Sequence, residues 1–245
     1  MDYGLGFISL GIGYLAGSIN FARIITRIFA PEVDLNAFTI KMKDGGKNEY
    51  LGGVGAGAAR MVVGSKMGIV TAVLDILKVV LPMLTIKLLY PNSPYYLIAG
   101  FGGLLGHVWP IYYRFKGGRG MSIMLGSFLV MDWIGVLWMM FLGSFLGFVF
   151  IGFPMLAYIL WMWLMIPWAI WRLDTPEVIF AVVMNLSFLI ASIPEMKTMQ
   201  RLKREGKYEA YSERVYGSSA PLGFMKKMTD RFWVFRPIIE RLNRK

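Results

Sequence analysis

Long apolar runs separated by short polar stretches dominate the pattern along this chain. The first run spans Gly4 to Ala30, which is long enough to cross about 30 Å of hydrocarbon as a helix. A second run follows from Met67 to Tyr90, and a third from Tyr95 to Tyr113. No basic residue precedes the first run and no small-residue cleavage pattern follows it, so it predicts a retained span and not a signal peptide.

The later runs predict further spans. The run from Met121 to Phe153 is too long for one straight crossing, and Asp132-Trp133 is its only polar break. We therefore predict two spans there, the first of them short, with a turn at Asp132. A Trp-rich span from Pro154 to Trp171 and a last one from about Pro176 to Ile193 complete the pattern. The sequence thus predicts an all-α membrane bundle of about seven transmembrane helices.

The charges between the runs predict the orientation. The stretch from Pro31 to Lys66 and the loop from Arg114 to Arg119 are both rich in Lys and Arg, whereas the turn from Pro91 to Pro94 has no charge. Because basic loops stay in the cytoplasm, both basic loops are expected there. The N-terminus then lies outside and the C-terminus inside, as in a multi-pass protein of the plasma membrane.

The last fifty residues differ from the rest in their charge. We expect residues 1–194 to form the transmembrane domain and residues 195–245 to form a cytoplasmic, basic tail. Between Gly223 and Leu242 the tail interleaves bases with aromatic and aliphatic side chains. This pattern favours a helix or hairpin that lies on the anionic lipid headgroups of a bilayer.

Composition narrows the function classes. The 245 residues are 56% hydrophobic and 17% charged, which excludes a disordered chain and does not fit a soluble domain of this size. With no Cys and one His, we expect no disulfide, no thiolate nucleophile, no metal site and no cofactor. The net charge of +11 points to lipid headgroups or a phosphorylated substrate and not to nucleic acid, because the bases flank membrane spans.

The most informative local motif is Phe115-Lys116-Gly117-Gly118-Arg119-Gly120. Consecutive glycines bring backbone N–H groups close to an anion, and a following helix N-terminus and two cations add positive charge. This combination suits a phosphate, held by Lys116, Arg119 and the N–H groups of Gly117 and Gly118. The alternative is a tight turn in a basic loop. The spacing of a Walker loop is absent, so a nucleotide triphosphatase is not indicated.

Other polar side chains lie in or near the spans. His107 is about nine residues, or less than three helical turns, before Lys116 and could act as a base or as a hydrogen-bond donor; the alternative is a structural role. Ser18 and Asn20 are further polar candidates in the first span. For Asp75 and Lys78 we favour a structural i,i+3 pair near a helix end.

Four of these segments resemble the PlsY family of bacterial membrane acyltransferases. They are Gly17-Ser18-Ile19-x-Phe21, Leu74-Asp75-Ile76-Leu77-Lys78, Gly106-His107 and the motif from Phe115 to Gly120, in matching order and spacing. Gly55-Ala56 through Gly64-x-Lys66 is similar to a fifth family segment. The resemblance covers about the first half of the chain. It implies acyl transfer from acyl phosphate to glycerol 3-phosphate or a related phosphorylated polyol, giving lysophosphatidate.

The resemblance also implies roles for individual residues. The catalytic residues would be His107 and Lys116. The residues that bind substrate would be Ser18, Arg60, Lys66, Gly117, Gly118, Arg119, Gly120 and Glu195. An acyl phosphate is a mixed anhydride whose phosphate leaves readily, so no covalent acyl-enzyme is implied.

Several positions depart from the family pattern. The family's Ser-Gly-Asn falls near Leu51-Gly52-Gly53 and its Thr-Asn near Gly57-Ala58, which removes hydroxyl and amide groups. A family Arg falls on Met61, beside Arg60, and Asn20 replaces a Pro. Of a late His-Arg-Glu-Asn only Glu195 remains, and residues 36–50 form an insertion. The alternative to an acyltransferase is therefore a noncatalytic homolog that binds or transports phosphate-bearing lipids.

Overall fold

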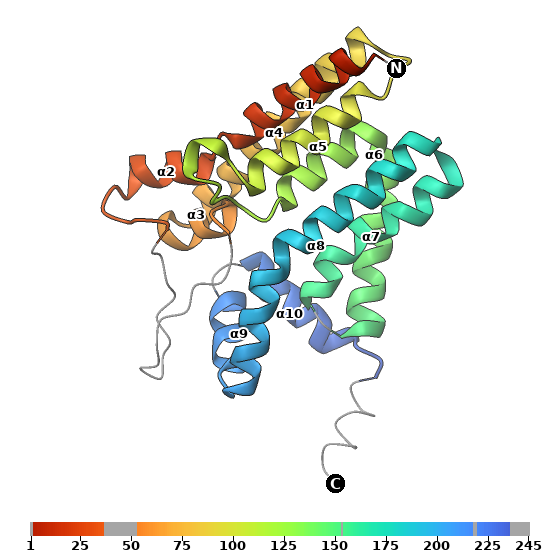
Figure 1. Cartoon of the computed structure of the whole chain (residues 1–245). Helices are drawn as coiled ribbons and strands as arrows, with labels where there is room; N and C mark the ends of the chain where they lie inside the picture. Colours follow the sequence, from red (N-terminus) through yellow and green to blue (C-terminus); the bar gives the residue numbers. More distant parts are fainter. Residues whose placement is uncertain (1, 37–52, 153, 218–219, 236–245) are drawn as a thin grey trace.

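A computed structural model of the chain describes residues 2–36, 53–152, 154–217 and 220–235, and these residues contain helices but no strand (Figure 1). Ten α-helices follow one another in this part of the chain: α1 (Tyr3–Ser18), α2 (Phe21–Phe29), α3 (Ala56–Val63), α4 (Ser65–Leu89), α5 (Tyr95–Val108), α6 (Met121–Leu146), α7 (Pro154–Arg172), α8 (Thr175–Arg204), α9 (Tyr208–Gly217) and α10 (Ala220–Phe232). A 3₁₀ turn at Ile111–Tyr113 and a π turn at Gly147–Ile151 complete the described structure.

Four helical segments are long and apolar enough to cross a membrane: Tyr3–Phe29, Ser65–Leu89, Met121–Ile151 and Thr175–Arg204. A shorter apolar helical segment occupies Ile159–Arg172. Large apolar side chains such as Phe7, at 75% exposed, and Leu88, at 79%, point outward from this bundle. Such outward apolar side chains suit contact with lipid tails and not with water. The described residues are therefore helical, with segments long and apolar enough for a membrane protein, as the apolar pattern predicts.

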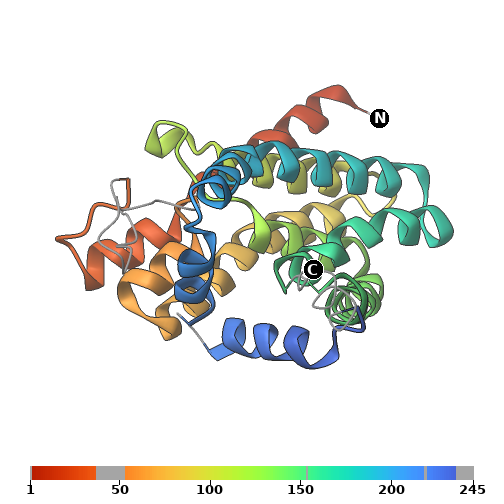
Figure 2. The same ribbon diagram turned by 90° about the horizontal axis from the view of Figure 1, so that it is seen from below.

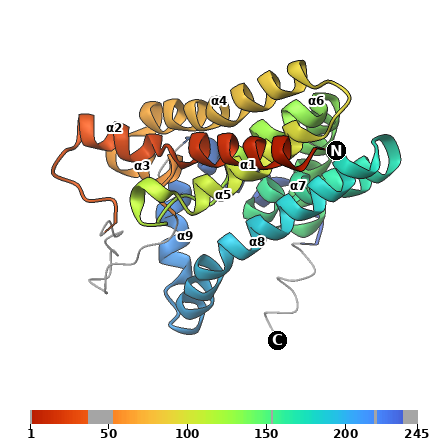
Figure 3. The ribbon, with the colours of Figure 1, turned by 45° about the horizontal axis from the view of Figure 1, so that its top comes forward.

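Small residues bring α1 and α5 into backbone contact. A Cβ added at Gly13 would overlap the carbonyl of Ala99, and one added at Gly17 would overlap the carbonyl of Gly103. Because both contacts advance in the same direction along the two helices, α1 and α5 are parallel. Figure 3 shows α1 lying over α5 and α4. Small residues allow such close packing in membranes, where no hydrophobic force drives one helix onto another.

The first apolar run does not form one continuous helix, contrary to its prediction. The helix breaks at Ile19 and Asn20, both of which have extended backbone. The Asn20 side chain accepts a hydrogen bond from the N–H of Arg23 at 3.0 Å and so caps α2. A good N-cap stabilises a new helix start, which explains why the apolar pattern alone did not reveal the break.

The predicted turn at Asp132 is present as a sharp kink within α6. Asp132 has φ −154° and ψ 97°, and its carboxylate accepts a hydrogen bond from the N–H of Ile134 at 3.1 Å. Before the kink α6 packs along α4; after it, Gly135 packs against Trp168 and Gly143 against Trp161, so this half runs antiparallel to α7. The polar break at Asp132 thus separates two helical segments that pack against different neighbours.

The last predicted span ends later than expected. We predicted an end at Ile193, but α8 continues through Pro194 to Arg204. A proline inside a helix costs one backbone hydrogen bond and causes a local clash, without always ending the helix. The tail residues from Ala220 to Phe232 form α10, which Figure 2 shows crossing the lower end of the bundle. The N–H of Val234 donates to the carbonyl of Val149 at 3.0 Å, which joins the tail to the π turn.

Candidate active site at the glycine loop

The segment Phe115–Gly120, called the glycine loop below, folds back on the end of α5. The N–H of Phe115 donates to the carbonyl of Pro110, and the N–H of Gly118 donates to the carbonyl of His107, both at 3.0 Å. Arg114 and Phe115 have positive φ values of 51° and 60°, a conformation that is uncommon outside glycine. The N–H of Gly118 is therefore already bonded, and only the one at Gly117 remains for the phosphate we predicted.

Glycine is required in this loop because neighbouring atoms leave no space. A Cβ added at Gly117 would overlap the carbonyl of His107, and one added at Gly118 would overlap the imidazole Nε2. On the opposite side, a Cβ at Gly53 would lie 2.7 Å from the carbonyl oxygen of Gly117. The N–H of Val54 donates to that same carbonyl at 2.8 Å. The loop is thus held between α5 and the residues before α3.

Gly120 ends the loop and starts α6. Its φ of +94° lies in the region that favours glycine, and a Cβ there would overlap the side chain of Leu104. Gly120 therefore shapes the loop through its backbone.

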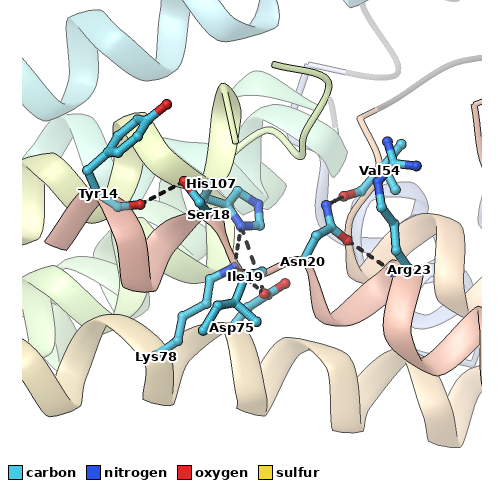
Figure 4. Close-up of polar contacts among 9 residues, drawn as sticks. All are labelled: Tyr14, Ser18, Ile19, Asn20, Arg23, Val54, Asp75, Lys78 and His107. Atoms are coloured by element: carbon cyan, nitrogen blue, oxygen red, sulfur yellow. Dashed lines mark hydrogen bonds and ion pairs between the residues drawn. The ribbon is translucent and has the colours of Figure 1, made fainter. Parts of the chain in front are cut away.

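Asn20 links the break after α1 to this loop. Its amide Nδ2 donates to the carbonyl of Val54 at 2.8 Å, while its Oδ1 caps α2 (Figure 4). The side chain of Arg23 continues the link, since its Nη2 donates to the carbonyl of Lys116 at 2.9 Å. Asn20, which replaces the family Pro, therefore makes one tertiary hydrogen bond, to Val54, and caps the helix whose Arg23 bonds to the loop.

A cavity of about 250 Å³ opens beside the loop. Lys116 and Arg119 contribute its cations, and the remaining lining combines apolar side chains, backbone and one amide: Leu35, Asn36, Gly53, Val54, Val108, Trp109, Phe115, Gly117, Ile190, Ala191 and Pro194. Cations beside an apolar wall suit a ligand that carries both a phosphate and a hydrocarbon chain.

Arg119, which lines this cavity, pairs with Glu195. The Arg119 Nε is 3.4 Å from a carboxylate oxygen of Glu195, and the Arg119 Nη1 donates to the carbonyl of Ala191 at 2.9 Å. Both partners are in α8, so the guanidinium is oriented from one side and its remaining N–H groups can reach a ligand.

Asp34 adds a negative charge next to Leu35 and Asn36, which line the cavity. The backbone and side-chain N–H groups of Asn36 donate to its carboxylate, both at 2.8 Å, and lower the pKa of Asp34 below its usual value. Arg23 and Lys116 lower it further through their charges. Asp34 is therefore ionised at neutral pH, beside the lysine of the loop.

Asp75, Lys78 and His107 form a buried polar cluster behind the loop (Figure 4). The Lys78 Nζ lies 2.8 Å from Asp75 Oδ1 and 3.0 Å from His107 Nδ1. We predicted the Asp75–Lys78 pair near a helix end, but it lies in the middle of α4. Helical spacing predicted the pair itself, whereas its contact with His107 depends on the packing of α4 against α5.

Three other predicted site residues, Ser18, Arg60 and Lys66, are described by the structure but do not line the cavity. Ser18 is buried and donates its hydroxyl to the carbonyl of Tyr14 at 2.8 Å, one turn back in α1. Arg60 is partly buried in α3 and contacts α4 near Gly68. Lys66 is exposed in the first turn of α4. Their proposed contacts with substrate therefore require a ligand that extends beyond this cavity.

Part of the predicted acceptor region lies outside the described residues. This holds for Leu51, Gly52 and the insertion from 36 to 50 except Asn36, so for its lysines 41, 43 and 47 as well. Within the described part, Gly57 is exposed with no atom within 4 Å of an added Cβ, and Ala58 is buried.

Sequence reasoning missed several residues that line the cavity. Asn36, Trp109 and the α8 residues Ile190, Ala191 and Pro194 carry no local motif. The Trp109-Pro110 pair, which begins two residues after His107, is a signal that could have drawn attention to this end of α5.

The helical bundle has the apolar segments of a membrane protein, and its cavity beside Lys116 and Arg119 suits an amphiphilic anion. The sequence matches the glycerol-3-phosphate acyltransferase family over residues 7–204, and the chain belongs to this family. This family supplies membrane acyltransferases of phospholipid synthesis, so the resemblance found in the motifs is confirmed.

Individual relatives agree with this assignment. The glycerol-3-phosphate acyltransferase of Pelagibacter ubique is 39% identical over 113 residues, which are 46% of this chain and 52% of the relative. Glycerol-3-phosphate acyltransferase 1 of Lactobacillus johnsonii is 34% identical over 157 residues, 63% of this chain and 70% of the relative. The first of these matches therefore spans about half of the curated relative's length.

Two crystal structures share the fold. Both are of PlsY (YgiH), an integral membrane glycerol 3-phosphate acyltransferase, in its lysophosphatidic acid form and its glycerol 3-phosphate form. Each has a TM-score of 0.63 and covers 82% of this chain and 93% of PlsY, at 21% and 23% identity respectively.

Proposed function

We propose that this chain transfers a fatty acyl group from acyl phosphate to glycerol 3-phosphate or a related phosphorylated polyol, giving lysophosphatidate and inorganic phosphate. The observation that carries the proposal is the cavity in which Lys116 and Arg119 face an apolar wall from α5 and α8. The cations suit the donor phosphate, and the wall suits the start of an acyl chain. Membership of the acyltransferase family supports the same reaction.

The chemistry requires positioning and charge neutralisation more than bond activation. The acceptor hydroxyl oxygen attacks the acyl carbonyl carbon, the bond from that carbon to the phosphate oxygen breaks, and phosphate leaves with its electron pair. The hydroxyl proton passes to His107 or to a phosphate oxygen of the substrate. Lys116, Arg119 and the N–H of Gly117 stabilise the leaving phosphate. In comparable sites each such contact contributes on the order of 3 kcal/mol. With no Cys in the chain, the acyl group is expected to pass directly between substrates.

The acceptor is the second substrate of the proposed reaction. One of the PlsY structures is a glycerol 3-phosphate form, which supports a polyol phosphate here as well. Gly53, Gly57 and Ala58 offer no hydroxyl or amide group. Asn36 lines the cavity and Arg23 lies next to it, bonded to Asn36 Oδ1 at 2.9 Å. We infer that these two residues take over part of the acceptor contacts.

For the membrane topology we propose seven crossings of the plasma membrane, with the N-terminus outside and the glycine loop in the cytoplasm. The kink at Asp132 supports counting α6 as two crossings, and the basic loops support the orientation. Residues 1–194 would form the transmembrane acyltransferase domain. Residues 195–245 would form a tail that rests on anionic headgroups, although α8 crosses this boundary.

Reconstitution tests the proposed reaction. The purified chain in liposomes receives acyl phosphate and a panel of polyol phosphates, and both the acylated product and free phosphate are measured. We expect equal release of product and phosphate with glycerol 3-phosphate or one other member of the panel. Tight binding of acyl phosphate without turnover would instead support the noncatalytic lipid-binding alternative.

A further inference from the structure

The residues after α8 fold back onto the helical bundle. Helix α9 packs against both α8 and α10, and α10 packs against the π turn and α7 (Figure 2). Leu202, near the end of α8, is fully buried although its neighbours Arg201 and Lys203 are exposed. The match to the acyltransferase family ends at residue 204, so this returning segment lies beyond the part of the chain that matches the family.

Trp233 joins the end of α10 to the bundle. A Cβ added at Gly152, directly after the π turn, would overlap the Trp233 indole, so the ring lies against this glycine. The next residue adds the backbone hydrogen bond from Val234 to Val149. The indole Nε1 is buried and has no hydrogen-bond partner in the described part of the chain. The contact with Gly152 therefore depends on the shape of the ring and not on a hydrogen bond.

Helix α8 can bend at the position where it lines the cavity. Ile190 and Pro194 are both part of the lining. Because proline has no N–H, the carbonyl of Ile190 lacks the donor that an ordinary residue would supply, and helices bend most readily at such positions. The part of α8 that follows begins with Glu195, which pairs with Arg119. The position of Glu195 therefore depends on what holds the far end of α8.

We infer that residues 205–217 and 220–235 form a strap that holds the second half of α8 in place, and that Trp233 is a positioning residue that acts through α8 on Arg119. The strap continues from the end of α8 and is joined at its other end to the connection between α6 and α7. While it is attached, Glu195 remains beside Arg119 and orients the guanidinium. The effect on substrate binding rests on the proposed function, whereas the attachment of the strap does not.

Spin labels test the attachment directly. The chain has no Cys, so Gly57→Cys in α3 and Arg204→Cys at the end of α8 carry the only two labels. Gly152 and Gly206 form a matched pair, with φ values of +69° and +68°, but no atom lies within 4 Å of a Cβ added at Gly206. Gly152→Ala and Trp233→Ala should each broaden the distribution of distances between the labels, and Gly206→Ala should not. An unchanged distribution in the first two variants would overturn the inference.

Activity in liposomes tests the effect on the site. Because a guanidinium that is not held must be ordered when it binds phosphate, Trp233→Ala should raise the KM for acyl phosphate by roughly twofold to fivefold, with little change in kcat. Trp233→Phe keeps an aromatic ring against Gly152 and loses only the unpartnered N–H, so its KM should stay closer to that of the wild type.

Phe232→Ala is the control, because it removes an exposed apolar side chain of α10 next to Trp233. It should leave the KM unchanged. An equal rise in this variant would show that the segment acts through the membrane surface, and this result would overturn the strap. If the wild type shows no acyl transfer, the proposed function fails, and the distances between the spin labels still decide whether the strap holds α8.

Discussion

Arg119 and Glu195 join the glycine loop to α8, with the guanidinium Nε 3.4 Å from the carboxylate. The two residues were predicted separately as contacts for substrate. Their pairing indicates that Glu195 orients Arg119. An oriented guanidinium loses less entropy when it binds a phosphate, so this orientation should favour binding.

Glu195→Gln should weaken the use of acyl phosphate moderately. The ion pair is only partly buried, so its loss is worth about 1 kcal/mol or less, equivalent to a rise in KM of up to about fivefold with little change in kcat. Glu177→Gln, which changes a glutamate bonded to Tyr96 elsewhere in α8, should have no such effect. An equal rise in KM in both variants would show that the charge of α8 matters and not this pair.

Lys116→Ala and Arg119→Ala should each remove most of the activity. Each substitution removes a charge-assisted contact worth about 1.5 to 3 kcal/mol, or roughly tenfold or more in rate. Lys116→Arg should also be poor, because a planar guanidinium does not replace a compact ammonium. The measurement is the initial rate of phosphate release in liposomes. Arg172→Ala, a control at the far end of α7, should retain the rate. Near-normal turnover in the loop variants would show that the loop is only a tight turn and does not bind phosphate.

Gly118→Ala should disrupt the site by steric overlap, without changing its charge. The added methyl group would overlap the imidazole of His107, and overpacking of this kind costs about 1 to 3 kcal/mol. We expect at least tenfold lower activity and a lower Tm in detergent. Gly57→Ala adds the same group in α3 where no atom lies within 4 Å, and it should keep or raise the Tm. Equal melting temperatures for the two variants would contradict the close packing of the loop.

The seam between α1 and α5 offers a second matched pair. Gly13→Ala places a methyl group against the backbone of Ala99, whereas Gly11→Ala, two residues earlier in the same helix, meets no atom within 4 Å. Thermal unfolding in detergent should therefore detect a loss of about 1 to 3 kcal/mol for Gly13→Ala and none for Gly11→Ala. Destabilisation by both would mean that the helix itself, and not its contact with α5, requires glycine.

Cysteine labelling tests the proposed topology. The natural chain has no Cys, so Ser93→Cys in the uncharged turn and Ser65→Cys at the start of α4 can each be labelled alone. An impermeant thiol reagent applied to intact cells should label position 93 and leave position 65 unlabelled until the membrane is opened. Labelling of both from the same side would refute an odd number of crossings between them.

The sequence predicted those features that depend on local pattern. The helices and the bend at Asp132 follow from runs of apolar residues and one polar interruption, and the glycine loop follows from its motif. The break at Asn20 and the passage of α8 through Pro194 could not be predicted, because each depends on tertiary hydrogen bonds or packing that overrides a local tendency.

The same division applies to the site. Lys116, Gly117 and Arg119 were identified from one short segment and all line the cavity. Trp109 and Ile190 reach the cavity only because α5 and α8 pack beside each other, and no spacing within either helix reveals this. The expected N–H donor at Gly118 is bonded to His107, a contact that depends on how far the loop folds back.

The parallel contact between α1 and α5 also determines an order of events during synthesis. A ribosome releases α1 first, yet the surface that receives Gly13 and Gly17 belongs to a helix that emerges after α4 has already crossed in the opposite direction. Until α5 is made, Gly13 and Gly17 lack the backbone against which they pack. The first helix to be made must therefore wait for a later one, and its docking joins α1 to the helix whose end carries His107 and holds the glycine loop.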